Sequence, residues 1–356
     1  MLLARTAIAR GAVVVNRCEA KGLVRENGQV RGVQVLDAES GEATTLRARC
    51  VVNATGVWVD AIRDLDVDDG AAPRPRLVAP SQGVHVVVDR LFMPGTHALL
   101  VPKTADGRVL FAVPWLGKTI LGTTDTPRED LALEPTPFAD EVAFILGESA
   151  RYLARAPQRS DVRSVWVGLR PLVKPQGDDG ESTKSMSREH TVVVGRSGLV
   201  TVTGGKWTTY RSMAEDVLAR CMARGLLQHK PAGVTAQLPL IGAAPGRPLG
   251  EPPGEHLYGS EAALLRTLPG AANWLWRDAE SGKGALSEAM VRFAARYEMA
   301  REVEDVLARR CRLLFLDAAE AGRQADAVAA ILSEELGRPV QAEGFKSLAA
   351  QYLRLP

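Results

Sequence analysis

A break rich in proline and glycine divides the sequence into two unlike parts. Residues 230–255 contain six prolines and five glycines, which neither a continuous helix nor a central strand can accommodate. Before the break, short apolar runs separated by Gly and Pro predict strands. After it, apolar residues recur at helical spacing almost to the end. The pattern predicts a mixed α/β domain over residues 1–228, a linker over 229–255 and an all-helical domain over 256–356.

Within the first part, the sequence predicts a helix end, two groups of strands and two helices. A helical period in the first ten residues closes at Gly11, which is typical of a helix terminus. Asn27-Gly28 predicts a hairpin turn. The short spacing of the second group predicts an antiparallel sheet. The expected strands cover 13–15, 22–25, 30–36, 44–47 and 50–52, then 84–88, 98–101, 109–113, 119–122, 162–172, 191–194 and 199–203, with helices at 138–153 and about 204–224.

Composition excludes several classes of function. Lys plus Arg exceed Asp plus Glu by only two, so no overall positive field favours nucleic acid. The four cysteines are scattered without a CxxC pair, and the sequence predicts no metal site. The longest apolar run is shorter than the roughly 20 residues that a bilayer requires, and no signal-type segment opens the chain.

Two glycine-containing turns are candidates for ligand binding. The residues Gly204-Gly205-Lys206-Trp207-Thr208 stand where a predicted strand gives way to a helix. The unpaired N–H groups and dipole of a helix start favour an anion or a polar carbonyl, although a purely structural cap is the alternative. The residues Asn53-Ala54-Thr55-Gly56 form a bare turn after an apolar run. Such a turn admits a flat or phosphorylated ligand, or it is an ordinary strand-to-helix connection.

Four isolated polar features complete the candidate list. His85 interrupts an apolar strand, and it faces either solvent or a pocket in which imidazole could transfer a proton. Arg170 and Arg188 lie at strand ends, where guanidinium groups bind anions or make surface ion pairs. The run from Gly122 to Thr126 offers hydroxyls and a carboxylate, and a turn or helix cap explains it equally well.

Taken in order, these motifs resemble the FAD-dependent glycerol-3-phosphate dehydrogenase family, within the wider group of amine- and hydroxy-acid-oxidising flavoproteins. The resemblance covers nearly the whole chain. It is carried by VVNATGVWVD, SQGVHVVVDR, FAVPWLGKTILGTTDT, VGLRPLV, SREHTVVV, VTVTGGKWTTYRSMAEDV and, in the helical part, RYEMAREVEDVLARRCRLLFLDA. The helical part distinguishes this family from the wider group. The resemblance implies an α/β (α+β) fold: an incomplete FAD-binding Rossmann-like domain with an inserted antiparallel substrate-binding sheet over residues 75–187, plus the all-helical C-terminal domain.

The resemblance also implies roles for the candidate residues. FAD would be contacted by Asn53, Ala54, Thr55, Gly56, Gly204, Gly205, Lys206, Trp207 and Thr208. C2 of glycerol 3-phosphate would give a hydride to FAD while His85 takes the hydroxyl proton and Arg170 stabilises the developing alkoxide. Arg188 and Lys206 would bind the substrate phosphate.

One departure from the family is large. No G-x-G-x-x-G unit is present in the sequence, although a helix start of that kind should bind the FAD pyrophosphate. We therefore expect Met1 to be an internal start or the product of a split gene, with a separately encoded N-terminal fragment as partner. Alone, the chain is expected to bind FAD poorly and to be inactive or unstable.

The resemblance further implies a quinone as electron acceptor, attachment to the cytoplasmic, inner face of the cell membrane, and a homodimer. Three alternatives stay open at this point. They are a glycerol-3-phosphate oxidase that uses oxygen, a non-catalytic or split-enzyme fragment, and an oxidase of amino acids or other amines. The helical tail counts against the last.

Overall fold

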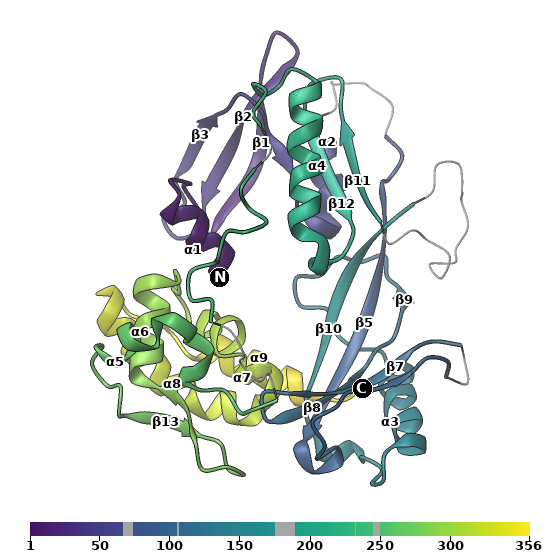
Figure 1. Cartoon of the computed structure of the whole chain (residues 1–356), viewed down its shortest axis with the longest axis vertical. Helices are drawn as coiled ribbons and strands as arrows, with labels where there is room; N and C mark the ends of the chain where they lie inside the picture. Colours follow the sequence, from purple (N-terminus) through teal and green to yellow (C-terminus); the bar gives the residue numbers. More distant parts are fainter. Residues whose placement is uncertain (67–73, 105–106, 175–188, 232, 245–249) are drawn as a thin grey trace.

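The computed structural model describes residues 1–66, 74–104, 107–174, 189–231, 233–244 and 250–356. Figure 1 shows three lobes. Two small sheets and helix α4 form the upper one, the long strands β5 and β10 run down into the lower right one, and the C-terminal helices form the lower left one. Among the described residues, no helix combines the length and the apolar content needed to cross a membrane.

The first small sheet, which we call the hairpin sheet, follows helix α1 (Leu2–Ala9). Its antiparallel order is β1-β2-β3. The strands are β1 (Cys18–Glu26), β2 (Gln29–Asp37) and β3 (Ala43–Arg47). Asn27 and Gly28 both have positive φ, at 52° and 74°, which is the two-residue turn that fits the twist of a hairpin. The predicted turn is confirmed.

The strand expected at residues 13–15 is wrong. These residues lie in an unpaired segment, in which Val13 is 91% exposed and Val15 65% exposed. Apolar sequence alone predicted a strand here, but a strand also requires a neighbour for its backbone groups.

The second sheet, which we call the small sheet, has the order β11-β12-β4. Its strands are β4 (Val52–Asn53), β11 (His190–Val194) and β12 (Val200–Gly204). β4 pairs with β12 in parallel and forms one edge. Helix α4 (Tyr210–Ala223) packs on the sheet through Val217 and Cys221. Helix α2 (Val59–Asp64) follows β4 after a short 3₁₀ turn.

The third sheet, which we call the large sheet, has the order β10-β5-β8-β7-β6, with β9 paired to the end of β5. Every pairing in it is antiparallel, as predicted. The strands are β5 (Val78–Asp89), β6 (Leu99–Val101), β7 (Leu110–Trp115), β8 (Lys118–Gly122), β9 (Thr126–Pro127) and β10 (Val162–Val173).

One face of the large sheet is an apolar core. Helix α3 (Ala139–Tyr152) covers it, so that Val142 and Ile145 pack against Val84, Val86 and Leu121, none of them exposed to solvent. Because side chains alternate along a strand, Ser81, Gly83 and His85 of β5 point to the opposite face. The candidate residues therefore lie on the face that α3 leaves open.

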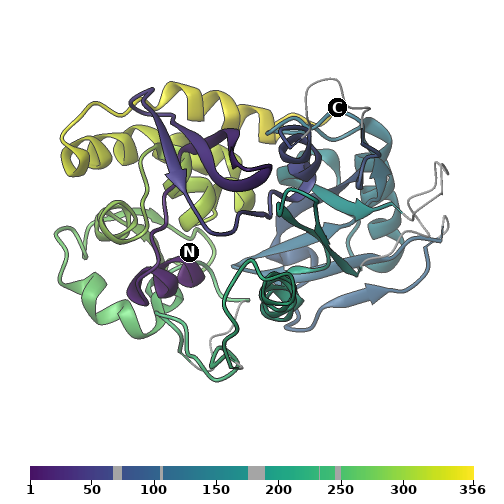
Figure 2. The same ribbon diagram turned by 90° about the horizontal axis from the view of Figure 1, so that it is seen from above.

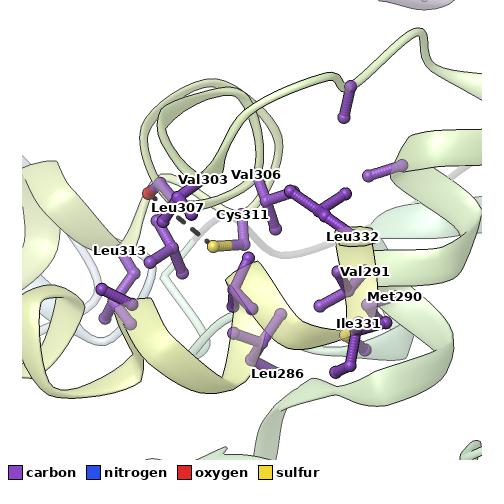
Figure 3. Packing of buried hydrophobic residues seen from close by; sticks show 14 of the residues in the cluster. Leu286, Met290, Val291, Val303, Val306, Leu307, Cys311, Leu313, Ile331 and Leu332 are labelled. Carbon is purple, nitrogen blue, oxygen red and sulfur yellow. Dashed lines mark hydrogen bonds between the residues drawn. The ribbon is translucent and has the colours of Figure 1, made fainter. Parts of the chain in front are cut away.

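The C-terminal domain, residues 256–356, is mainly helical. Its helices are α5 (Ala262–Arg266), α6 (Glu288–Tyr297), α7 (Leu313–Leu316), α8 (Ala318–Leu336) and α9 (Glu343–Leu353). Fully buried Leu286, Leu307 and Leu332 pack together at its centre (Figure 3). The predicted helical character of this part is confirmed. The prediction that it contains helices alone is wrong, because β13 (Trp274–Arg277) and β14 (Gly284–Ser287) form a two-stranded sheet.

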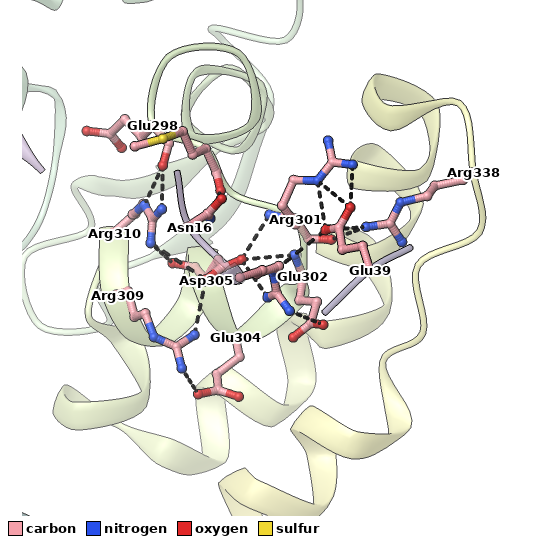
Figure 4. Close-up of polar contacts among 12 residues, drawn as sticks. Asn16, Glu39, Glu298, Arg301, Glu302, Glu304, Asp305, Arg309, Arg310 and Arg338 are labelled. Atoms are coloured by element: carbon pink, nitrogen blue, oxygen red, sulfur yellow. Dashed lines mark hydrogen bonds and ion pairs between the residues drawn. The ribbon is translucent and has the colours of Figure 1, made fainter. Parts of the chain in front are cut away.

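Ion pairs join the C-terminal domain to the hairpin sheet. Glu39, between β2 and β3, accepts hydrogen bonds from Arg301 at 2.8 Å and Arg338 at 3.2 Å (Figure 4). Arg17 binds Glu302 at 2.6 Å and the buried Asp305 at 3.0 Å. Burial alone would raise the pKa of Asp305, but the Arg301 backbone N–H and the Arg17 guanidinium hold it below its ordinary value. Viewed from above, the C-terminal helices and the large sheet lie beside each other (Figure 2).

Candidate functional site

His85 occupies the middle of β5, between a tryptophan and a glycine. The register places Trp166 of β10 on one side of it and Gly122 of β8 on the other. The imidazole stacks on the Trp166 indole, with ring centroids 4.1 Å apart and an interplanar angle of 16°. A Cβ added to Gly122 would lie 2.7 Å from Cδ2 of His85. Glycine at position 122 therefore makes room for the imidazole.

Arg170 lies on the same face as His85, because the register aligns it with Ser81 and aligns Trp166 with His85. Its guanidinium lies across Gly83, where an added Cβ would be 2.0 Å from Nη2. Nη2 donates a hydrogen bond to Oγ1 of Thr123 at 3.0 Å, and Asp125 lies 3.6 Å from Nη1. The structure thus brings together the two residues that were predicted to share the chemistry.

The environment of His85 keeps its ring neutral. Burial, with a smaller contribution from the positive charge of Arg170, lowers the pKa of His85 to about 3. Both effects disfavour imidazolium, because a buried cation loses hydration and is repelled by a like charge. The ring is therefore unprotonated throughout the neutral range but weakly basic, and an anion bound nearby would make it a stronger base.

Three polar atoms on this face are buried without a partner. Among the described residues, Oγ of Ser81, Nδ1 of His85 and Nε1 of Trp166 make no hydrogen bond. Buried polar groups are almost always paired, so each exception calls for a physical reason. Three such atoms on the sheet face that also carries Arg170 fit a polar ligand. We call Ser81, His85, Trp166 and Arg170 the polar face.

The glycine pair at the end of β12 forms a tight turn, but the prediction that a helix opens at Gly204 is wrong, because α4 begins at Tyr210. Gly204 and Gly205 have positive φ, at 75° and 70°, and an added Cβ on Gly204 would lie 2.6 Å from the Glu189 carbonyl oxygen. A 3₁₀ turn over Trp207–Thr209 then leads into α4. Backbone strain and crowding both require glycine at position 204.

The side chains after this turn are open to solvent. Lys206 and Thr208 are exposed, and Trp207 is 76% exposed although its ring stacks on Tyr210 at 5.2 Å. Lys206 makes no ion pair with any described residue. The hydroxyl of Thr203 just before the turn is buried and, within the described part of the chain, has no partner. A bare turn with an open aromatic platform fits a flat cofactor.

The other predicted cofactor turn is held by Asn53. This side chain is buried, donates to the Val59 carbonyl at 2.8 Å and accepts from the Thr55 hydroxyl at 2.7 Å. Because the side-chain amide of Asn53 is hydrogen-bonded to Val59 and Thr55, it stabilises the conformation of the turn. Ala54 and Thr55 are exposed and Gly56 has φ of 63°, so the backbone of the turn remains accessible to a ligand.

The end of β10 connects the polar face to the Gly204 turn. Val173 lies three residues beyond Arg170, and its Cγ2 would be 2.7 Å from a Cβ on Gly204. Arg188 falls outside the described residues, so its predicted place beside the substrate stays a prediction. Sequence analysis missed Ser81 and Trp166. Only the strand register, which no local pattern reveals, brings them beside His85.

Comparison with known families gives two matches along the chain. Residues 1–211 match the family of FAD dependent oxidoreductases, and residues 255–342 match the C-terminal domain of alpha-glycerophosphate oxidase. The two matches lie on either side of the stretch in which the sequence predicts a linker.

Curated relatives carry the name glycerol-3-phosphate dehydrogenase. The mitochondrial protein of Arabidopsis thaliana is 37% identical over 94% of this chain and 56% of its own length. The human mitochondrial protein is 35% identical over 94% of this chain and 48% of its own length. The chain thus spans about half the length of the curated relatives it matches.

A solved structure agrees with the fold. The glycerol-3-phosphate dehydrogenase from Bacillus halodurans, complexed with FAD, superposes with a TM-score of 0.79 at 26% identity. The superposition covers 99% of this chain and 72% of the other. The arrangement of the large sheet, the small sheet and the C-terminal domain is therefore shared with a flavoprotein.

Proposed function

Because the chain belongs to the FAD-dependent oxidoreductase family, we propose that it builds the substrate side of an enzyme that oxidises sn-glycerol 3-phosphate to dihydroxyacetone phosphate. FAD, when bound, supplies the acceptor for the hydride that leaves C2. The names of the curated relatives support the substrate. The observation that carries the proposal is the polar face, where polar atoms of Ser81, His85 and Trp166 that have no partner in the described part of the chain share a sheet face with Arg170.

His85 would take the proton of the C2 hydroxyl. Its ring is neutral and its Nδ1 has no partner among the described residues. The negative charge of a bound phosphate would raise the imidazole pKa and favour the transfer. Arg170 would stabilise the charge that develops on the C2 oxygen, with Asp125 and Thr123 holding its guanidinium in place.

Two cations are proposed to bind the substrate phosphate. Lys206 is exposed at the turn that β10 approaches through Val173, and Arg188 stands in the sequence between β10 and β11. A phosphate dianion needs cationic donors of this kind, and a bidentate guanidinium adds directionality. The Arg170 guanidinium already contacts the side chains of Asp125 and Thr123. Lys206 and Arg188 are therefore the better candidates for binding the phosphate.

The two turns of the small sheet are proposed to hold FAD. Gly204, Gly205, Lys206, Trp207 and Thr208 would line the ring system, and Asn53, Ala54, Thr55 and Gly56 would contact the cofactor through their backbone. The positive φ angles of Gly56, Gly204 and Gly205 and the open surface of Trp207 support this assignment. Three of these positions allow the backbone to approach a ligand more closely than a side chain would permit.

A nucleotide-binding unit is the proposed partner, in the same polypeptide or as a separate N-terminal chain. In the described residues, nothing pairs with the outer edge of β4, and Val52 is 42% exposed there. Unpaired edges with apolar side chains invite another strand. The greater length of the curated relatives is consistent with such a unit. A homodimer is a further proposal that rests on family resemblance.

The electron acceptor is proposed to be a membrane quinone, reached from the inner face of the cell membrane. The match of residues 255–342 to an alpha-glycerophosphate oxidase domain favours oxygen as the alternative. Peroxide formed in stoichiometric amount with dihydroxyacetone phosphate, and not suppressed by a ubiquinone analogue, would establish the alternative.

The proposal is tested by product formation. The chain, co-expressed with a family N-terminal unit, should convert glycerol 3-phosphate to dihydroxyacetone phosphate in the presence of an artificial electron acceptor. Glycerol, which lacks the phosphate, should react far more slowly. Flavin-loaded protein that forms no dihydroxyacetone phosphate would refute the substrate, and equal rates with glycerol would refute phosphate recognition.

A further inference from the structure

A chain of aromatic rings links the polar face to the C-terminal domain. The imidazole of His85 stacks on Trp166. On the other side of Trp166 lies Phe315 of α7. Its ring meets the Trp166 indole edge-on, with ring centroids 5.5 Å apart and an interplanar angle of 77°. Phe315 in turn meets Tyr352 of α9 at 5.8 Å. Two elements that are distant in the sequence, β5 and α7, thus meet on the indole that β10 carries.

Ring contacts are what fix His85 and Trp166. Among the described residues, neither Nδ1 of His85 nor Nε1 of Trp166 has a hydrogen-bond partner. The neighbouring positions Gly83, Gly122 and Gly168 carry no side chain that could restrain the rings. Phe111 lies beside His85, with centroids 5.7 Å apart. Stacked and edge-on pairs are directional, so the placement of one ring determines the next.

The C-terminal domain holds Phe315 firmly against β10. Oγ of the buried Ser164, two residues before Trp166, donates to the Leu314 carbonyl at 2.9 Å. On the other side of Phe315, the Tyr352 hydroxyl donates to Glu134 at 3.0 Å. Phe315 is therefore anchored by its own backbone neighbour and by the ring behind it.

We propose that Phe315 is a positioning residue for His85, acting through Trp166, so that the C-terminal domain sets the orientation of the imidazole and limits its contact with water. The effect of Phe315 on turnover rests on the proposed function. The structural coupling of Phe315 to His85 does not. The C-terminal domain thereby gains a direct role at the polar face. Without Phe315, Trp166 loses its edge contact, both rings gain freedom, and more of the imidazole is exposed to water.

The coupling predicts a change in the ionisation of His85. Among the described residues, the charged group that acts on the ring is Arg170 on β10, which has Asp125 3.6 Å from its guanidinium, and substitution of Phe315 alters neither. Hydration of the ring should therefore move its pKa from about 3 toward the ordinary value of 6.5. In the wild type, the His85 signal should not titrate between pH 5 and 9.

The test is histidine NMR of the chain without substrate or cofactor, with the His85 signal assigned by its loss in His85→Gln. Phe315→Ala and the better-filled Phe315→Leu should each make His85 titrate in the accessible range. The matched control is Phe293→Leu, a fully buried ring of the same domain whose ring contacts are Tyr258 and Tyr297. This control should leave the His85 signal unchanged.

Two outcomes would overturn the proposal. One is a His85 signal that Trp166→Ala moves but both Phe315 variants leave unchanged. The other is an equal response to Phe293→Leu, which would indicate general loosening of the domain. Because Phe315→Leu retains most of the side-chain volume, it keeps the test decisive if Phe315→Ala does not fold. Absence of glycerol-3-phosphate oxidation would refute the proposed function and leave this coupling standing.

Discussion

The large sheet and the small sheet place candidate residues in opposite situations. In the large sheet, α3 covers one face and the C-terminal domain approaches the other, so that the partly buried His85 lies among closely packed aromatic rings. In the small sheet, β4 is an edge with no further strand among the described residues, and the turn after β12 leads to exposed Lys206 and Trp207. The proposed substrate residues are thus enclosed by elements of this chain, whereas the proposed cofactor residues lie on an open surface.

The difference shows how a binding site is divided between local and distant structure. The turns of the small sheet depend on short sequence signals, such as glycine where φ is positive. The polar face depends on strand register over residues far apart in the chain. Substitutions in the large sheet and substitutions in the small sheet should therefore have different effects on the protein.

The largest effect is expected at the polar face. His85→Gln should slow reduction of bound FAD by glycerol 3-phosphate about 10²–10⁴-fold, because a positioned proton acceptor contributes that much to the rate. Stopped-flow absorbance measures the rate, and FAD content should stay unchanged because His85 belongs to the large sheet. A loss of less than threefold would remove His85 from the chemistry.

Truncation of an apolar side chain should lower the free energy of unfolding more in the large sheet than at the edge of the small sheet. Leu121→Ala removes a fully buried side chain from the large sheet and should lower the free energy of unfolding by about 2–5 kcal/mol. Val52→Ala on the open edge of the small sheet should change it by less than about 0.5 kcal/mol. Urea denaturation measures both. A cost at Val52 as large as that at Leu121 would show that the edge is already covered.

The turn after β12 should be intolerant despite its exposure. Gly204→Ala combines a positive φ with an oxygen 2.6 Å from the new Cβ, whereas Gly225→Ala has φ of 68° and nothing within 4 Å. Both should lose about 1–2 kcal/mol for the left-handed backbone, and Gly204→Ala should lose about 1–3 kcal/mol more for crowding. Equal denaturation midpoints for the two variants would contradict this turn geometry.

The smallest effect concerns pH. The pKa of His85 is lowered when folded, so the unfolded chain binds more protons below the ordinary value of 6.5, and stability should fall as pH falls from there. At pH 5 the contribution lost amounts to about 2 kcal/mol. His85→Gln should flatten the pH dependence of unfolding between pH 7 and 5 by this amount. Parallel curves would indicate that the imidazole is hydrated.

Most strands and the key turn could be predicted from sequence, because their signals are local. β8 and β10 match their expected ranges within one residue at each end, and α4 ends one residue before its expected end. β5 was predicted too short because Pro80 indicated a loop, yet Pro80 pairs with Pro171 inside the sheet. The neighbours of His85 could not be predicted, since Trp166 and Gly122 reach it only through register.

We propose that a further unit pairs with the edge of β4 and completes FAD binding, whereas the polar face is formed within the large sheet. The most direct measurement is flavin absorbance of the purified chain, alone and co-expressed with a family N-terminal unit, before and after anaerobic addition of glycerol 3-phosphate. We expect little flavin in the chain purified alone and near-stoichiometric flavin in the chain co-expressed with the N-terminal unit. Glycerol 3-phosphate should bleach the flavin of the co-expressed protein. Stoichiometric flavin in the chain alone, or a flavin-loaded pair that the substrate does not bleach, would contradict it.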